Sequence, residues 1–403
     1  MDSLTQIVLG AAVGEATLGR RVGNRAMLWG GLAGTLPDLD VLSGWVTDPM
    51  SALAYHRAFT HSFPFALLAA PLLGLVVHRL YGGRAGPRMR NGWLYAAAFA
   101  LFYLLLFIGS SLMPLPVYGI PAIAAVVSGV FALLCVPVGA FSRRNGPNAS
   151  PRQWTLLFFL AIVTHPLLDC FTAYGTQFLQ PLARLRIAWN TVSVVDPLYT
   201  LPFLLLLIAA ARQGARTQVR RRLNGAGLLL STGYLLLTVI NAFNVGDVVR
   251  DSLRAEGVPI RREVHSPTLG NNLLWSATVQ TDDDTYYLGQ YSLLDRQRRL
   301  RPLRRVAGNH ALLADYAGDR DLEILQWFTD GYYTVLPDGP GRVRLADLRY
   351  GTMGGDPDDP AAYIFSWSLD TTRHPIRVAE ERGGPQGDRG AALAEMWQRM
   401  LGE

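Results

Sequence analysis

The sequence contains no lysine and only two cysteines, Cys135 and Cys170, both inside apolar stretches. Buried thiols are therefore expected, and a disulfide framework is not supported. Charged residues make up only 17% of the chain, and no basic face is interleaved with aromatic residues, which argues against nucleic-acid binding. The N-terminal segment has no basic region and no clear cleavage site, so no cleavable signal peptide is expected.

Long hydrophobic runs dominate the first 245 residues. Half of all residues in the chain are hydrophobic, and a helix needs about 20 mainly apolar residues to cross a bilayer core. The sequence therefore predicts an α-helical polytopic membrane domain of about eight hydrophobic helices over residues 1–245. The predicted spans are Leu4–Leu18, Ala26–Trp45, Ser62–Leu80, Trp93–Leu112, Val117–Phe141, Trp154–Phe171, Asp196–Ala211 and Gly225–Phe243.

Arginine-rich loops separate the hydrophobic spans. With eight spans, four of these loops fall on one side, which the positive-inside rule assigns to the cytoplasm. Arg184 and Arg186 are the exceptions on the other side. We therefore expect a multi-pass protein of the bacterial cytoplasmic (inner) membrane. The loop arginines are Arg20, Arg21 and Arg25; Arg79, Arg84, Arg88 and Arg90; Arg143, Arg144 and Arg152; and Arg212 through Arg222.

The character of the sequence changes near residue 246. Charged residues become frequent, and segments such as LLWSATVQ, TYYLGQYSLL, GYYTVL and AAYIFSWSL are bounded by turn-forming residues. Residues 246–403 are therefore predicted to form a small, soluble, mainly β domain with a polar tail. Asp247–Leu369 is its β-rich part, and Ala391–Leu401 is a short helix. The predicted eight spans place this domain outside the cytoplasm.

Three short stretches place ionisable side chains within or beside the apolar spans. Such groups are energetically costly in lipid and are usually paired or functional. The stretches are GTLPDLD, YHRAFTHS and THPLLDCFTAYGTQ. Their polar residues are Asp38 and Asp40, then His56, Arg57, Thr60 and His61, and finally His165 and Asp169.

The spacing of these residues favours a shared metal site. His165 and Asp169 are four apart, so on a helix they project from one face. The predicted topology brings all three stretches to one depth near the outer face. Histidine nitrogen with carboxylate oxygen suits Zn²⁺, with Mn²⁺ or Fe²⁺ as alternatives, better than Ca²⁺ or Mg²⁺. The predicted metal ligands are Asp38, Asp40, His56, His61, His165 and Asp169.

Each stretch also has a structural interpretation when it is taken alone. A histidine near a helix end is more often a hydrogen-bonded polar residue than a ligand, and a His–Asp pair four residues apart can be a buried hydrogen bond. The PDLD segment can be a helix-ending turn with a capping aspartate. The metal prediction therefore depends on the three stretches together.

In this order, PDLD, HRAFTHS and HPLLDCFTAYGTQ resemble the motifs of the LexA-binding, inner-membrane-associated hydrolase family of bacteria, whose members are described as membrane-bound metal-dependent hydrolases. The resemblance covers residues 1–210. It implies a metal-dependent hydrolase embedded in the inner membrane and says little about the C-terminal domain. It also implies a histidine early in the first helix, where this sequence has Gln6, which can act as a weak neutral ligand or a hydrogen-bond donor.

Glu15 lies inside the first predicted span. A glutamate within a membrane span is a candidate ligand, general base or proton relay. Glu15 lies about 13 Å along a helix from the depth of Asp38, which counts against direct ligation. Pairing with an arginine is the structural alternative, and the sequence does not decide between the two.

Further candidate residues follow from position. Arg57 either clamps a phosphate or carboxylate or faces lipid headgroups. Thr60, Tyr174 and Gln177 can orient substrate or support the ligands. Asp196 begins the seventh predicted span, where an N-cap is its expected role and contact with the site is the alternative.

Together these residues predict a metal-dependent hydrolase at the outer face of the cytoplasmic membrane. The metal would activate water and polarise a carbonyl or phosphoryl oxygen, with Glu15, Asp40 and Arg57 as the catalytic residues. A membrane lipid or lipid-like ester is the expected substrate, a phosphoester is slightly favoured because of Arg57, and no nucleic-acid partner is expected. The alternatives are a transporter or metal permease, and a non-catalytic membrane scaffold with a structural metal.

Overall fold

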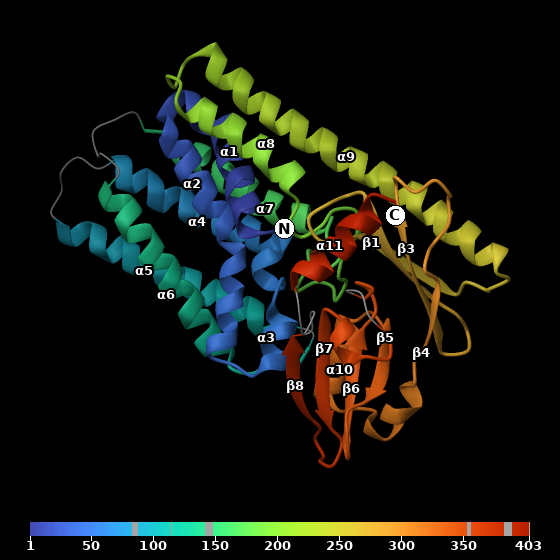
Figure 1. Cartoon of the computed structure of the whole chain (residues 1–403). Helices are drawn as coiled ribbons and strands as arrows, with labels where there is room; N and C mark the ends of the chain where they lie inside the picture. The colour runs from blue at the N-terminus through green and yellow to red at the C-terminus, as the bar shows by residue number, and fades with distance from the viewer. Residues whose placement is uncertain (83–87, 114, 142–147, 353–355, 383–388, 403) are drawn as a thin grey trace. The chain divides into compact units, whose positions relative to one another are not determined.

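The computed structural model describes residues 1–82, 88–113, 115–141, 148–352, 356–382 and 389–402 (Figure 1). Contacts between residues divide the chain into two compact units. The first contains Met1–Trp189 and Pro197–Leu235, and the second contains Asn190–Asp196 and Leu236–Glu403. The predicted domain boundary after residue 245 stays a prediction.

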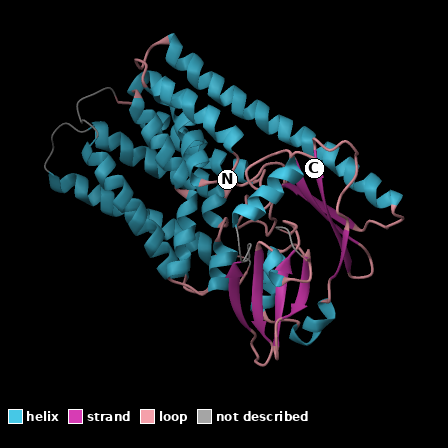
Figure 2. Ribbon diagram, viewed as in Figure 1, coloured by secondary structure: helices cyan, strands magenta, loops and turns pink. Residues whose placement is uncertain are grey.

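The described part of the first unit is built from helices (Figure 2). Cys170 is buried with a free thiol, and the side chain of Cys135 lies outside the described part of the chain. The elements are α1 (Ser3–Val22), α2 (Asn24–Thr35), η1 (Pro37–Trp45), α3 (Pro49–Tyr55), η2 (Phe59–His61), α4 (Phe63–Gly82), α5 (Arg88–Ser111), α6 (Ile120–Phe141), α7 (Pro151–Asp169), α8 (Pro197–Ala211) and the first part of α9 (Gln218–Ala255).

Helices α1 and α2 pack closely because glycines face one another across their interface. A Cβ atom on Gly30 would lie 2.2 Å from the carbonyl oxygen of Gly10, and one on Gly14 would lie 2.2 Å from that of Ala26. Small residues at such positions let helix backbones approach one another. The turn between the two helices is made by Gly23, whose φ of 63° favours glycine.

We expect a Gly30→Val variant to destabilise the first unit by about 1–3 kcal/mol, because its Cβ would meet rigid backbone. Denaturant unfolding of the detergent-purified protein measures the change. Gly225→Val is the matched control, since nothing lies within 4 Å of a Cβ on Gly225. Equal unfolding free energies for the two variants would contradict the close contact between α1 and α2.

The prediction of about eight membrane-spanning helices is wrong. Among the described residues, α4 over Phe63–Tyr81 and α9 are the helices long and apolar enough to cross a membrane. The predicted span Ala26–Trp45 is divided between α2 and η1. Pro37, which begins η1, has no N–H with which to continue the preceding helix. Shorter apolar helical stretches cover Ala97–Ser111, Ile120–Leu133 and Pro197–Ala211.

The prediction of which parts of the chain lie on which side of the membrane depended on eight spans, so it is no longer supported. The outer-face positions of the metal site and of the C-terminal domain both depended on the alternation of eight crossings, which the structure contradicts. Among the arginines used for that argument, Arg84, Arg143 and Arg144 lie outside the described residues, and so do the side chains of Arg88 and Arg90.

The second unit contains two antiparallel four-stranded sheets, so the predicted C-terminal β domain is confirmed (Figure 2). In each sheet the strands lie in the order of the sequence. The first sheet is β1 (Arg262–Pro267), β2 (Leu274–Gln280), β3 (Thr285–Ser292) and β4 (Arg304–Ala307), and the second is β5 (Tyr333–Pro337), β6 (Arg342–Asp347), β7 (Phe365–Asp370) and β8 (Arg377–Arg382). The helical elements are η3 (His310–Tyr316), α10 (Arg320–Phe328), η4 (Pro360–Ala362) and α11 (Arg389–Met400).

Helix α9 extends beyond the point at which the sequence suggested a change to β structure. Asp247–Ala255 belongs to this helix, although the segment was predicted to begin the β-rich region. Leu253 packs in the same buried core as Trp275 of β2, whereas Arg254 is exposed and pairs with Asp251 at 2.9 Å. The frequent charges therefore mark the outer face of an amphipathic helix.

Candidate metal centre

Four side chains from separate stretches bring their ligand atoms together in the first unit. Asp38 lies in η1, His61 in η2, and His165 and Asp169 at the end of α7. Nε2 of His165 lies 3.1 Å from Nε2 of His61 and 3.3 Å from Oδ1 of Asp38. Oδ2 of Asp169 lies 3.4 Å from Nε2 of both histidines. Nε2 of His61 lies 3.5 Å from Oδ1 of Asp38.

Five of the six separations among the four ligand atoms match the edges of a tetrahedron around one metal ion. Zinc–ligand bonds of about 2.0–2.1 Å give ligand–ligand separations of about 3.3–3.4 Å. The distances above lie between 3.1 and 3.5 Å, and all four atoms lie within 4.8 Å of one another. Asp38, His61, His165 and Asp169, the ligand group, could therefore hold a metal ion.

Backbone contacts orient His165 toward this group. The carbonyl oxygen of Gly34, at the end of α2, lies 2.5 Å from Nδ1 of His165. This contact places the ring proton on Nδ1 and leaves the lone pair of Nε2 for the ligand group. A Cβ on Gly34 would lie 2.5 Å from the carbonyl oxygen of Gln6, so glycine is needed for α2 to approach this closely.

Asp40 lies behind the ligands and not among them. Its Oδ2 lies 3.1 Å from Nδ1 of His61 and accepts a hydrogen bond of 2.7 Å from the backbone N–H of Arg57. Its Oδ1 lies 2.9 Å from Nδ1 of His56. A carboxylate on the far nitrogen of a metal-binding histidine fixes the tautomer and the ring orientation. The buried Asp40 thus orients His61 in the way that the Gly34 carbonyl orients His165.

The carboxylates of Asp38 and Asp40 carry their charge at neutral pH. Burial by itself raises the pKa of Asp38, but the rings of His165 and His61 outweigh it and hold that pKa below the usual aspartate value. Burial also raises the pKa of Asp40, and His56 and His61 likewise reverse the effect. The carboxyl of Asp38 is therefore in the ionised form that binds a cation, and a bound cation would replace the protons of the facing imidazoles.

We expect an Asp40→Asn variant to bind metal about 10–100-fold more weakly, because the His61 ring loses its charged orienting partner. Zinc titration against a chromogenic chelator measures the affinity. Asp48→Asn is the matched control, since Asp48 caps α3 through its side chain and asparagine caps helices equally well. Unchanged affinity in the Asp40 variant would contradict this role.

The structure does not bring His56 into the ligand group. Its side chain is 29% exposed, and its ring centroid lies 6.2 Å from that of His61 and 5.1 Å from that of Tyr174. His56 is therefore a partly exposed imidazole, held by Asp40, beside the ligands. The sequence predicted that His56 and Asp40 are metal ligands, but neither belongs to the group of side chains that could hold a metal ion in the structure.

Arg57 is buried beside the ligand Asp169. Its Nε lies 3.4 Å from Oδ2 of Asp169, and its Nη1 donates a hydrogen bond of 2.8 Å to Oγ1 of Thr172. Its backbone has a φ of 55°, a left-handed conformation that is uncommon for a residue with a side chain. Such conformations cluster at functional sites, where surrounding contacts hold them in place.

Gln6 contacts the ligand group as a hydrogen-bond donor. Its Nε2 donates to Oδ1 of Asp169 at 2.9 Å and to the carbonyl oxygen of His165 at 3.2 Å. Its Oε1 is buried without a hydrogen-bond partner. The amino group of Met1 also contacts Oδ1 of Asp169. The position at which the family resemblance implies a histidine therefore faces the site.

Glu15 is paired with an arginine at a distance from the ligands. Oε1 and Oε2 of Glu15 accept hydrogen bonds of 2.6 and 2.5 Å from Nε and Nη2 of Arg220 in α9. Both side chains are buried, and Arg220 also donates to Asn24 at 2.7 Å. The structure thus favours the structural alternative for Glu15, with α9 joined to α1 by a buried ion pair.

The other predicted site residues occupy varied positions. Thr60 Oγ1 lies 3.3 Å from Oδ2 of Asp40, and Gln177 binds the carbonyl oxygen of Ala54 at 3.0 Å. The ring of Tyr174 lies against His56. Asp196 is buried but belongs to the segment that clusters with the second unit, so its predicted contact with the site stays a prediction.

Two groups that support the site were not singled out from the sequence. Thr172 accepts from Arg57 and donates a hydrogen bond of 2.8 Å to the carbonyl oxygen of Asp169. It lies inside the third polar stretch, three residues after a ligand, which was an available signal. No sequence signal pointed to the carbonyl oxygen of Gly34, because every residue has a backbone carbonyl oxygen.

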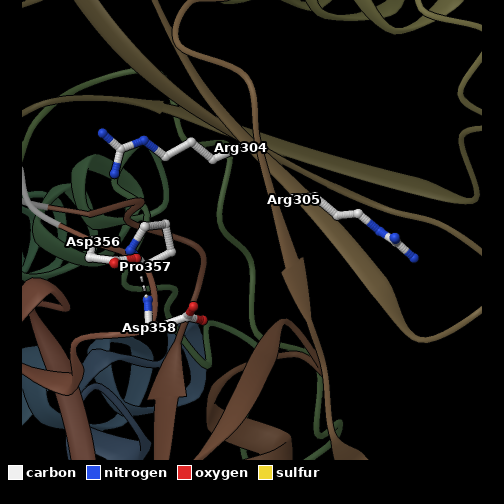
Figure 3. A pocket seen from close by; sticks show the side chains of 5 residues that line it. All are labelled: Arg304, Arg305, Asp356, Pro357 and Asp358. Carbon is white, nitrogen blue, oxygen red and sulfur yellow. Dashed lines mark hydrogen bonds between the residues drawn. The ribbon is translucent and has the colours of Figure 1, made fainter.

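A separate pocket lies on the second unit and is shown in Figure 3. Arg304 extends over the side where the aspartates lie, and Arg305 points away from them. The backbone N–H of Asp358 donates to Oδ1 of Asp356 at 3.1 Å. Because the pocket exposes both charge signs, we assign no ligand class to it. It is lined by Arg304, Arg305, Asp356, Pro357 and Asp358.

Comparison with known proteins identifies one family for the N-terminal part of the chain. A family model described as YdjM inner membrane protein matches residues 1–245. Neither a curated protein nor a solved structure matches the chain significantly. The matched range contains the complete ligand group and ends before the first strand of the second unit.

Proposed function

The chain belongs to the YdjM inner membrane protein family, and we propose that it is a metal-dependent hydrolase that cleaves a membrane-associated ester. The observation that carries the proposal is the tetrahedral spacing of the four ligand atoms. Two imidazole nitrogens and two carboxylate oxygens suit Zn²⁺, with Mn²⁺ and Fe²⁺ as alternatives.

A divalent ion held there would supply Lewis acidity, which activates water and polarises the scissile carbonyl or phosphoryl group. The side chains around it have unequal access to solvent. Those of His61, His165 and Asp169 are 0–1% exposed, whereas that of Asp38 is 20% exposed. Substrate therefore approaches from the side of Asp38.

We propose His56, the partly exposed imidazole beside the ligands, as the group that accepts the proton from water. Asp40 holds Nδ1 of its partly exposed ring, which leaves Nε2 as the accepting atom. The two carboxylates predicted as bases are already engaged. Asp40 contacts His61 and the backbone of Arg57, and Glu15 is paired with Arg220.

The substrate class follows from the side chains that accompany the ligands. Val41 and Trp45 are 63% and 74% exposed on η1, the element that carries Asp38. Exposed apolar groups beside a polar site suit a molecule with an apolar part, such as a lipid. Arg57 favours a phosphoester among the candidate esters, because a guanidinium matches the oxygens of a phosphate.

Phosphatidic acid in mixed micelles tests the proposal, because released phosphate reports phosphoester cleavage and released fatty acid reports carboxylic ester cleavage. The detergent-purified protein is stripped with a chelator and resupplied with Zn²⁺, Mn²⁺ or Fe²⁺. We expect release that stops on stripping and returns with metal. A rate that chelation leaves unchanged would contradict metal-dependent hydrolysis.

A structural metal is the second candidate function, and one observation favours it. All four tetrahedral positions are supplied by protein side chains, which is typical of structural zinc sites, whereas catalytic sites usually keep one position for water. In that case the stripped protein melts at a lower temperature than the loaded protein, and neither sample hydrolyses the micelles. Hydrolysis restored by metal excludes the purely structural role.

A further inference from the structure

The loop that follows α7 presents large apolar side chains on its surface. Leu182, Leu185 and Trp189 are 81%, 57% and 49% exposed. Single apolar residues on a protein surface are ordinary, but three in one short loop form a group of the kind that marks an interaction site. Residues 178–189 are called the apolar loop below.

Contacts within the first unit hold the apolar loop in a fixed shape. The backbone N–H of Leu182 donates to the carbonyl oxygen of Leu179 at 2.8 Å, and that of Trp189 donates to the carbonyl oxygen of Cys170 at 2.6 Å. The ring of Trp189 packs edge-on against that of Phe171, with 4.6 Å between the centroids. The apolar side chains are therefore exposed by an ordered loop and not by a frayed one.

The beginning of the apolar loop is joined to the first residue of α4. The backbone N–H of Phe63 donates to the carbonyl oxygen of Phe178 at 2.8 Å, and the centroids of the two rings lie 6.1 Å apart. Helix α4 is long and apolar enough to cross a membrane over Phe63–Tyr81. The end of such a span lies at the boundary between hydrocarbon and water. When α4 crosses a bilayer, Phe178 therefore lies at that boundary.

The backbone of the apolar loop and its exposed side chains together select one depth in the bilayer. Residues 178–189 form turns and take part in an isolated bridge, without a helix or a strand. Irregular backbone of this kind does not lie in the hydrocarbon, where its polar groups would lack partners. Leucine side chains, in contrast, are stabilised on leaving water, and tryptophan is enriched at the membrane boundary. The headgroup region satisfies both requirements.

We propose that the apolar loop is a membrane-binding surface that lies among the lipid headgroups, with Leu182 and Leu185 inserted toward the acyl chains. The partner is a bilayer and not another protein, because the loop adjoins the end of a helix that can span a membrane. The match of residues 1–245 to an inner membrane protein family supports the same partner. Insertion of this kind reaches about 5–10 Å into the boundary.

The ligand group lies at the same end of α4 as the apolar loop. His61 precedes the first residue of α4 by two positions, and the backbone N–H of Gln177 donates to the carbonyl oxygen of Arg57 at 2.9 Å. A lipid substrate of the proposed hydrolase would therefore meet the ligands at the membrane boundary. The membrane contact itself does not rest on the proposed function, since it is measured without metal or substrate.

Nitroxide spin labels on single cysteines test the proposal in the full chain reconstituted into bilayers of phosphatidylcholine and phosphatidylglycerol. Leu182→Cys and Leu185→Cys carry the labels in a chain with Cys135→Ala, whereas Cys170 is buried and is retained. Oxygen concentrates in lipid and a nickel chelate in water, so the ratio of their collision rates with the label reports its depth. We expect both labels to collide more often with oxygen, at a depth of about 5–10 Å into the boundary.

Leu312→Cys and Leu68→Cys are the matched references. Leu312, in η3 of the second unit, is 49% exposed, and its label should collide more often with the nickel chelate. Leu68, on α4, is also 49% exposed, and its label should show a higher oxygen ratio than either label on the loop. The chain without an introduced cysteine gives the background spectrum, and equal melting temperatures show that the labelled variants are folded.

Three results would overturn the proposal. Labels at positions 182 and 185 that meet the nickel chelate as often as the label at position 312 place the loop in water. Labels that meet neither oxygen nor the chelate show that protein covers the loop, either the second unit or a second copy of the chain. A label at position 68 that meets mainly the chelate removes the membrane span to which the loop is joined.

Discussion

A His165→Ala variant is expected to bind metal about a hundredfold more weakly and to show metal-dependent activity only at correspondingly higher metal concentration. Nε2 of His165 lies within 3.4 Å of the ligand atoms of Asp38, His61 and Asp169. The substitution therefore removes one of the four ligand atoms. Four-ligand zinc sites bind with roughly 10–16 kcal/mol. One ligand therefore contributes about 3 kcal/mol, which is about a hundredfold in affinity. Zinc titration against a competing chelator measures this loss.

The control for this variant is His78→Ala. His78 lies in α4, contacts the carbonyl oxygen of Ala149 at 2.8 Å and is not a member of the ligand group. Its zinc affinity should equal that of the unmodified protein. If the His165 variant folds and keeps full zinc affinity, the ligand group is assigned wrongly.

An Arg220→Met variant is expected to destabilise the first unit by about 3–5 kcal/mol, because the buried carboxylate of Glu15 loses its partner. The pair has two hydrogen bonds, and the two side chains are 1% and 3% exposed. Denaturant unfolding in detergent measures the free energy of unfolding. The exposed neighbour Arg221 provides the control as Arg221→Met, with an expected change near zero.

The double variant Glu15→Gln/Arg220→Met separates the ion pair from packing. Because neither charge remains, it should be more stable than Arg220→Met alone. Glu15→Gln should also keep its zinc affinity, since Glu15 is paired away from the ligand group. A Glu15→Gln variant with unchanged stability and abolished hydrolysis would show instead that Glu15 relays protons.

The ligand group could be predicted from sequence because its residue types and spacing carry geometric information. His165 and Asp169 are one helical turn apart, and α7 places both on one face. The choice between Asp38 and Asp40 could not be predicted. Both lie in η1, a 3₁₀ helix with three residues per turn, so residues two apart point in different directions. Only the position of the backbone decided that Asp38 reached the Nε2 atoms of His61 and His165, whereas Asp40 reached Nδ1 of His61.

The number of membrane spans could not be predicted from apolar runs alone. Hydrophobic composition does not distinguish a segment that faces lipid from one that packs against other helices. In α1 and α2, glycines such as Gly10 and Gly30 bring the two backbones together, and Pro37 ends one apparent run in its middle. In the second unit the turn residues located the strands, but the charged end of α9 concealed a helix whose inner face is buried.

The zinc K-edge X-ray absorption spectrum of the detergent-purified protein tests the central claim most directly. We predict one zinc ion per chain with four nitrogen or oxygen neighbours at about 2.0–2.1 Å, including the scattering of two imidazole rings. Loss of this spectrum in His165→Ala would accompany loss of the ion. A sulfur neighbour at about 2.3 Å, six oxygen neighbours without imidazole, or a protein that retains no zinc would contradict the account.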